Sequence, residues 1–166
     1  MTRILLIMSA CALYFSTSAY AAQTHTVYLV RHAEKEANQS NPSLTRCGQV
    51  RAHQLAKILE EAKIEKVYST STLRSMATAN PIASQQKLVI DNYLPDNLMI
   101  LALKLREGEQ NVLVVGHSNT TPQLIEMLTG AVIPEMSDSD YQELYQIQYI
   151  DGYTYLTTLK QPLTCQ

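Results

Sequence analysis

The sequence predicts an α/β fold: a three-layer α/β/α sandwich whose mostly parallel central sheet has an antiparallel edge. Short β-branched or apolar stretches alternate with longer segments of helical spacing, as in α/β proteins. Residues 111–115 form an apolar run that is typical of a central strand covered on both faces. Near the C-terminus, two further stretches flank Asp151-Gly152, a dipeptide typical of a two-residue hairpin turn.

The expected strands and helices follow from apolar spacing and from residues that begin or end helices. Ser43 or Thr45 can cap the first helix, and Gly108 and Gly130 mark later helix ends. Pro81 predicts a kink or an earlier stop in the second helix. The apolar stripe of the first helix is Val50, Leu55, Ile58 and Leu59. The expected elements are strand 24–30, a helix from about 45 to 62, strand 66–69, helix 73–85, strand 88–90, helix 96–106, strand 111–115, helix 122–128, and strands 144–150 and 153–159.

Residues 1–21 have the pattern of a secretory signal peptide, which leaves residues 22–166 as one domain. Arg3 supplies a positive start, an apolar stretch follows, and Ala19-Tyr20-Ala21 matches a cleavage site. The apolar stretch is too short to span a bilayer stably. We therefore expect export across the inner membrane to the periplasm. A buried first helix, or a lipid anchor on Cys11, remains an alternative.

The net charge bears on the class of partner, and the cysteines bear on a possible disulfide. The formal net charge of the chain is −2, and removal of Arg3 makes it one unit more negative. A mildly acidic chain argues against nucleic acid as the main partner. In an oxidising compartment Cys47 and Cys165 are candidates for a disulfide, a pairing that the sequence leaves open.

Two histidines directly follow strands of the predicted sheet. His32 comes after the first strand, beside Arg31, and His117 comes after the central strand. In open α/β sheets, ligands bind beyond the carboxyl ends of the strands, so we expect both histidines at one site. Arg74, at the start of the second helix, is expected to project from the same edge.

These residue types fit phosphoryl transfer. Arginine offers a rigid, charged fork that matches phosphate oxygens, which assigns Arg31 and Arg74 to phosphate binding. A neutral imidazole can attack phosphorus, and His32 is the candidate nucleophile. His117, if protonated, would neutralise charge on the transferring group.

Metal and cofactor sites find little support in the sequence. The run His32-Ala33-Glu34 matches the His-x-Glu of zinc deaminases, but their Pro-Cys-x-x-Cys is absent. There is also no glycine-rich nucleotide loop. We expect a reaction that needs neither a metal nor a cofactor.

An ordered set of motifs from about residue 26 to residue 155 resembles the histidine phosphatase superfamily, also called phosphoglycerate mutase-like. By that resemblance His32 becomes phosphorylated, and Arg31, Asn38, Arg74 and His117 bind the phosphate. The motifs are Arg31-His32-Ala33, Asn38, Leu44-Thr45-Arg46-Cys47-Gly48, Thr70-Ser71-Thr72-Leu73-Arg74 with Thr78-Ala79, and Gly116-His117.

The resemblance also implies a carboxylic acid that protonates the leaving oxygen. In the corresponding stretch, Leu94-Pro95-Asp96 makes Asp96 the first candidate and Asp91 the second, while Glu34 lies close to His32 in sequence. Capping of a helix is an equal alternative for Asp96. The acid is therefore left open among these residues.

The short interval between Arg74 and His117 leaves little room for a substrate-covering domain, as in small members of the family. An open site favours a phosphatase over a mutase, which must retain its intermediate under cover. The expected substrate is a phosphorylated small molecule, an envelope glycolipid or a phosphoprotein. The alternative is a catalytically inactive protein that binds a phosphorylated ligand. His53 is expected to lie on the surface or to take part in packing. The tyrosines between residues 141 and 155 are expected to pack on the edge strands or to form a lip over a sugar.

Overall fold

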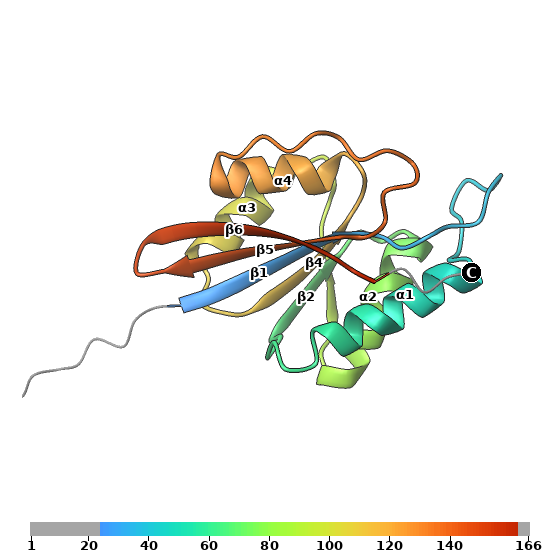
Figure 1. The fold of residues 1–166 in the computed structure, drawn as a ribbon, viewed down its shortest axis with the longest axis horizontal. Coiled ribbons are helices and arrows are strands. Elements are labelled where there is room, and N and C mark those ends of the chain that lie inside the picture. The colour runs from blue at the N-terminus through green and yellow to red at the C-terminus, as the bar shows by residue number, and fades with distance from the viewer. Residues whose placement is uncertain (1–23, 163–166) are drawn as a thin grey trace, which may run out of the picture.

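The described part of the chain is built around β4 (Val112–Gly116), a strand that is buried along its whole length. Within residues 24–162, which the computed structural model describes, six strands form one sheet in the order β3-β2-β4-β1-β5-β6 (Figure 1). β1 and β2 flank β4 and run parallel to it, β3 runs parallel to β2, and β5 and β6 are antiparallel. The other strands are β1 (Thr24–Arg31), β2 (Lys66–Ser69), β3 (Ile90–Asn92), β5 (Glu143–Ile150) and β6 (Tyr153–Lys160).

Helices cover both faces of this sheet, because successive residues of a strand point to opposite sides. Val112 and Val114 pack against α3 and α4, whereas Leu113 and Val115 pack against α1 and α2. The result is the predicted three-layer α/β/α sandwich with a mixed sheet (Figure 1). The helices are α1 (Arg46–Ile58), α2 (Leu73–Gln86), α3 (Leu98–Glu107) and α4 (Thr120–Thr129).

Several local expectations are confirmed. Thr45 caps α1, since its hydroxyl accepts a hydrogen bond from the backbone N–H of Gly48. Asp151 and Gly152 have φ angles of 50° and 83°, the left-handed pair that a tight hairpin between β5 and β6 requires. Gly130 ends α4 with a φ of 76°.

The predicted apolar stripe of α1 is partly wrong. Leu55 and Leu59 are buried, but Val50 and Ile58 are 40% and 44% exposed. The inward face is formed instead by small residues such as Ala52, because α1 packs closely against α2 and against the chain that follows β1. The helix also ends before residue 62.

Other element boundaries differ from the prediction by a few residues. Of the two expectations for Pro81, the earlier stop is wrong, because α2 continues to Gln86 and is followed by Lys87 in the left-handed conformation. β3 begins two residues later than expected, and α3 begins at Leu98, with Asn97 as its N-cap position in place of Asp96. Pro122 lies in the first turn of α4, as expected, and the helix begins at Thr120.

The expectations for the N-terminus fall on residues that the structure does not describe. The predicted signal peptide and Cys11 lie outside the described residues, and so does Cys165. Cys47 is disulfide-bonded, and its pairing with Cys165 stays a prediction. Between residues 24 and 162, no helix has the length and apolar character needed to cross a membrane.

The close approach of α1 to the end of β1 gives a test at Gly48. A Cβ atom at this position would lie 2.2 Å from the carbonyl oxygen of Glu34, a backbone atom that cannot easily move. Although Gly→Ala ordinarily stabilises a helix by about 1 kcal/mol, we expect Gly48→Ala to lower the free energy of unfolding by on the order of 2 kcal/mol. Urea denaturation measures the change, with the exposed Gln49→Ala as control. A stabilised Gly48→Ala variant would contradict this packing.

Candidate active site

The largest group of predicted site residues lies around one cavity at the carboxyl ends of β1 and β4. This main cavity has a volume of about 790 Å³. His32 follows β1, His117 follows β4, and Arg74 lies in the first turn of α2. The charged and imidazole side chains that line the cavity are Arg31, His32, Lys35, Arg74, Asp96, His117 and Asp138.

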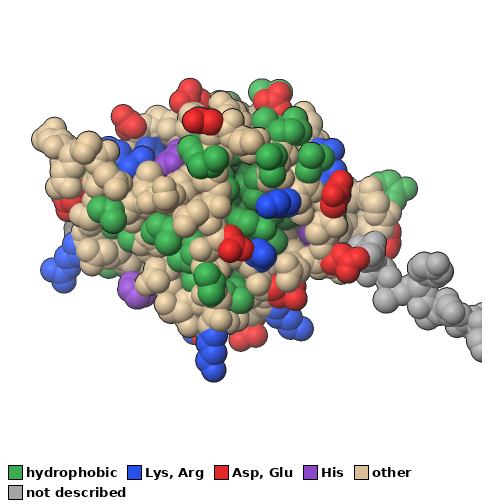
Figure 2. Space-filling view, turned by 180° about the vertical axis from the view of Figure 1, so that it is seen from behind, with side chains coloured by type: hydrophobic (Ala, Val, Ile, Leu, Met, Phe, Trp, Pro, Cys, Tyr) green, Lys and Arg blue, Asp and Glu red, His purple; other side chains and the backbone are tan. Residues whose placement is uncertain are grey.

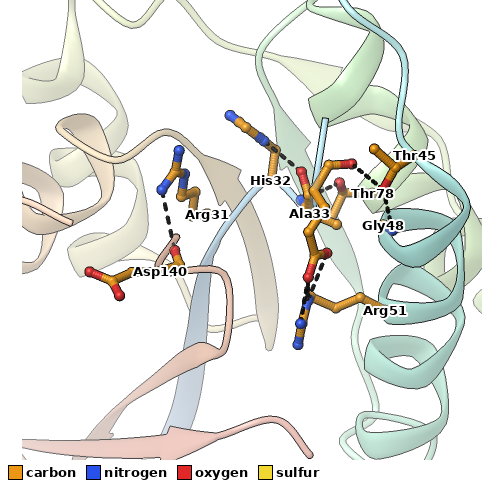
Figure 3. Close-up of polar contacts among 9 residues, drawn as sticks. Arg31, His32, Ala33, Thr45, Gly48, Arg51, Thr78 and Asp140 are labelled. Atoms are coloured by element: carbon orange, nitrogen blue, oxygen red, sulfur yellow. Dashed lines mark hydrogen bonds and ion pairs between the residues drawn. The ribbon is translucent and has the colours of Figure 1, made fainter. Parts of the chain in front are cut away.

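His32 is buried and held in one tautomer. Its Nδ1 lies 2.8 Å from the carbonyl oxygen of Ala33, which can only accept a hydrogen bond, so Nδ1 carries the proton. The lone pair of the neutral ring is therefore on Nε2. The backbone N–H of Ala33 in turn donates to the hydroxyl of Thr78 at 2.9 Å, which fixes the peptide that orients the ring (Figure 3).

Arg31 is buried and is held by the loop that precedes β5. Its Nη1 donates to the carbonyl oxygens of Ser137 and Asp140 at 2.5 and 3.3 Å, and its guanidinium lies 4.3 Å from the ring centroid of Tyr141. The exposed carboxylate of Asp138 is 3.5 Å from Nη2. Figure 3 shows the contact between Arg31 and the backbone of Asp140.

His117 lies beside His32 in the lining of the cavity. The two ring centroids are 5.5 Å apart and the rings are inclined by 66°. The Nε2 of His117 is 3.1 Å from the hydroxyl of Thr70, and its backbone N–H donates to the hydroxyl of Thr120 at 3.0 Å. The two rings are therefore in edge-to-face contact, and since both line the same cavity, one phosphate bound there can contact both histidines.

Burial and positive charge keep both histidines neutral in the ligand-free protein. Burial, and then Arg74 and Arg31, lower the pKa of His32 to about 3 and that of His117 to about 4. Burial and Arg31 also lower the pKa of the Arg74 guanidinium. A neutral His32 suits a nucleophile. A proton on His117 requires the charge of a bound dianion, which would counter the two arginines.

The main cavity presents hydrogen-bond donors that have no partner among the described residues. The Nε–H groups of Arg31 and Arg74 are buried without one, and so is the Nδ1 of His117, which is a donor only when it carries the proton. Unpaired buried donors are costly, and the oxygens of a phosphate would satisfy them. The first residues of α4, from Asn119, also line the cavity, where the positive end of the helix dipole favours an anion.

Two predicted residues are not brought into the main cavity. The carboxylate of Glu34 pairs with the buried Arg51 of α1 at distances of 2.5 to 2.9 Å, because a buried guanidinium needs an anion. In Figure 3 the ring of His32 points away from Arg51. Asn38 is exposed, has a φ of 61°, and does not line the cavity.

The two remaining candidates for the acid are placed differently. Asp96 lines the main cavity from an exposed position just before α3. Asp91 pairs with Lys66 at 3.0 Å on the edge of the sheet. Of the three carboxylates that the sequence left open, only Asp96 lines the cavity.

Other residues of the site were not assigned from the sequence. Lys35 and Asp138 line the cavity, Thr70 contacts His117, and Tyr141 lies against Arg31, with its ring centroid 6.1 Å from that of His32. Thr70 could have been identified from the sequence, because its hydroxyl lies four residues before Arg74 in the same motif. Tyr141 stood among tyrosines expected to pack on the edge, and Asp138 lies in a loop without periodicity. His53 is exposed, as expected.

Metal ligands do not cluster in the described part of the chain. Among residues 24–162, no group of three or more histidine, cysteine, aspartate or glutamate side chains is placed to hold a metal ion.

Comparison with known structures shows the same fold in several phosphoryl-transfer enzymes. The protein histidine phosphatase SixA with tungstate is 20% identical, with a TM-score of 0.67 over 81% of this chain and 96% of that chain. A mycobacterial glucosyl-3-phosphoglycerate phosphatase with inorganic phosphate is 12% identical, with a TM-score of 0.60 over 76% of this chain and 95% of that chain. Phosphoglycerate mutase from Plasmodium falciparum is 20% identical, with a TM-score of 0.58 over 81% of this chain and 89% of that chain.

The sequence itself matches one family model. Residues 27–95 match the histidine phosphatase superfamily (branch 1), a segment that includes Arg31, His32 and Arg74. No curated protein sequence matches the chain. The family match over residues 27–95 and the phosphoglycerate mutase-like fold agree with the predicted resemblance to the histidine phosphatase superfamily.

Proposed function

We propose that this protein is a phosphatase that hydrolyses a phosphomonoester or phosphoramidate through a covalent phosphate on Nε2 of His32, without a metal ion. The observation that carries the proposal is the state of His32, a neutral ring whose Nδ1 is fixed by the Ala33 carbonyl in a cationic cavity. Its Nε2 lone pair is free to attack phosphorus.

The reaction proceeds in two transfers. Nε2 of His32 forms a bond to phosphorus while the bond to the leaving oxygen breaks, and Asp96 gives that oxygen a proton. Water then attacks the phosphohistidine and gives a proton to the Asp96 carboxylate, the P–N bond breaks, and inorganic phosphate leaves, which restores neutral His32 and protonated Asp96. Arg31 and Arg74 bind the phosphate oxygens throughout, and His117 stabilises the charge that develops on them.

Several classes of phosphorylated substrate are compatible with this site. The main cavity is open enough for a phosphorylated small molecule, a glycolipid or a phosphoprotein. The neighbours in fold include a protein histidine phosphatase and a glucosyl-3-phosphoglycerate phosphatase, so the fold does not select among these classes.

Removal of the nucleophile tests the covalent step. His32→Ala should lower hydrolysis of p-nitrophenyl phosphate by about a thousandfold or more, because no phosphohistidine can form. Rapid quenching of the wild type with labelled substrate should trap an acid-labile phosphate that His32→Ala lacks. The exposed His53→Ala is the matched control, and activity should persist with a chelator. A wild type that binds inorganic phosphate but releases none from any ester is the inactive binding protein instead.

The role of Asp96 is tested by changing the leaving group. Asp96→Asn should lower kcat for an alkyl phosphate by about a hundredfold, because the alkoxide needs a proton. It should have little effect on p-nitrophenyl phosphate, since nitrophenolate leaves unprotonated. The same comparison with Glu34→Gln tests the other carboxylate. If Glu34→Gln alone shows the dependence on leaving group, the assignment to Asp96 is wrong.

The neutral histidines predict a specific loss of stability in acid. An unfolded histidine titrates near pH 6.5, whereas the folded pKa values of His32 and His117 are about 3 and about 4. Between these values the unfolded state binds more protons, so the free energy of unfolding falls as the pH is lowered from 7 toward 4. Denaturation is measured at several pH values. The free energy of unfolding of His117→Gln should fall less steeply with decreasing pH than that of the wild type, by up to about 1.4 kcal/mol per pH unit. His53→Gln should keep the wild-type slope; equal slopes in all three proteins would contradict neutral histidines.

A further inference from the structure

A second, smaller hollow lies beside α3 and differs in character from the main cavity. Its volume is about 180 Å³. We call it the α3 hollow. Most of its lining is aromatic or aliphatic, and Lys104 is the one charged side chain among the described residues that line it. The apolar lining consists of Tyr68, Tyr93, Leu94, Ile100 and Leu101.

The α3 hollow and the main cavity share a wall. Asn97 lines both, Leu94 lines the hollow, and Pro95 and Asp96 line the main cavity. The segment that carries the proposed acid therefore separates the two spaces by a few residues.

The surface between and around these spaces is unusually apolar. Leu94, Met99, Ile100 and Leu103 are 73%, 56%, 52% and 45% exposed. Figure 2 shows hydrophobic side chains gathered across the middle of the rear face of the molecule. A helix whose apolar residues also face solvent marks a binding surface, because a merely solvated face would be polar.

We propose that the α3 hollow binds the apolar end of the phosphomonoester whose phosphate occupies the main cavity, an inference that rests on the proposed function. The substrate class is then an amphipathic phosphate with a ring or short alkyl group. The volume fits, since a protein cavity of about 150 Å³ holds a benzene ring. The continuity with the main cavity through Asn97, and the apolar Met99 and Met127 on the wall of that cavity, assign the hollow to the substrate.

Alkyl phosphonates test the hollow by binding alone, because they carry the same dianionic head and no ester bond to cleave. Isothermal titration calorimetry should show octylphosphonate binding at least about tenfold more tightly than methylphosphonate, since each buried methylene adds to the affinity. Leu94→Gln and Ile100→Gln, both at exposed positions, should reduce this ratio severalfold and leave methylphosphonate binding unchanged. Val89→Gln, at a position 82% exposed and outside both cavities, is the matched control.

The outcomes separate this inference from the proposed function. Preferential binding of octylphosphonate by a protein that hydrolyses no phosphomonoester supports the hollow and overturns the phosphatase. Hydrolysis of aryl phosphates with equal affinities for the two phosphonates overturns the hollow alone. If Ile100→Gln changes only self-association in sedimentation, the apolar surface contacts a second copy and the inference is wrong.

Discussion

The position of every group in the site depends on the pairing of β1 with β4. In this parallel pair Arg31 lies opposite Gly116, and the N–H of His32 donates to the Gly116 carbonyl at 2.9 Å. The next residue after each of these paired positions is a histidine, so the pairing places His32 and His117 side by side in the lining of one cavity. A slip of one residue would reverse the faces of the strand and bury the wrong side chains. The hydrophobic core and the site therefore specify the same register.

The site combines two demands that conflict in water. Phosphate binding needs concentrated positive charge, and nucleophilic attack needs a histidine without a proton. Burial of His32 beside Arg74 and Arg31 meets both demands, because burial first, and then the charge of the guanidiniums that attract the dianion, lowers the pKa of His32. The arginines remain charged, and the imidazole gives up its proton.

The sequence could predict that certain residues lie close together where they end a strand, follow one or begin a helix. Arg31 ends β1, His32 and His117 follow strands, and Arg74 lies in the first turn of α2, so the sheet topology brings all four to the wall of one cavity. Glu34 lies only two residues past His32, yet its direction depends on Arg51, which becomes buried only when α1 docks on the sheet. The loop before β5 has no periodic pattern, so its contacts with Arg31 depend on tertiary structure and could not be predicted. Val50 shows the same dependence on tertiary structure within a helix. The close packing of α1 against α2 places small residues such as Ala52 on the inward face and leaves Val50 exposed.

The loop that precedes β5 holds Arg31 mainly through the carbonyl oxygens of Ser137 and Asp140. Carbonyl groups carry dipoles and no net charge, so they orient the guanidinium without neutralising it. Their positions follow the path of the backbone and not the identity of the side chains. Homologous chains can therefore differ widely in the sequence of this loop while keeping the arginine oriented, provided that the loop keeps its length and its turn.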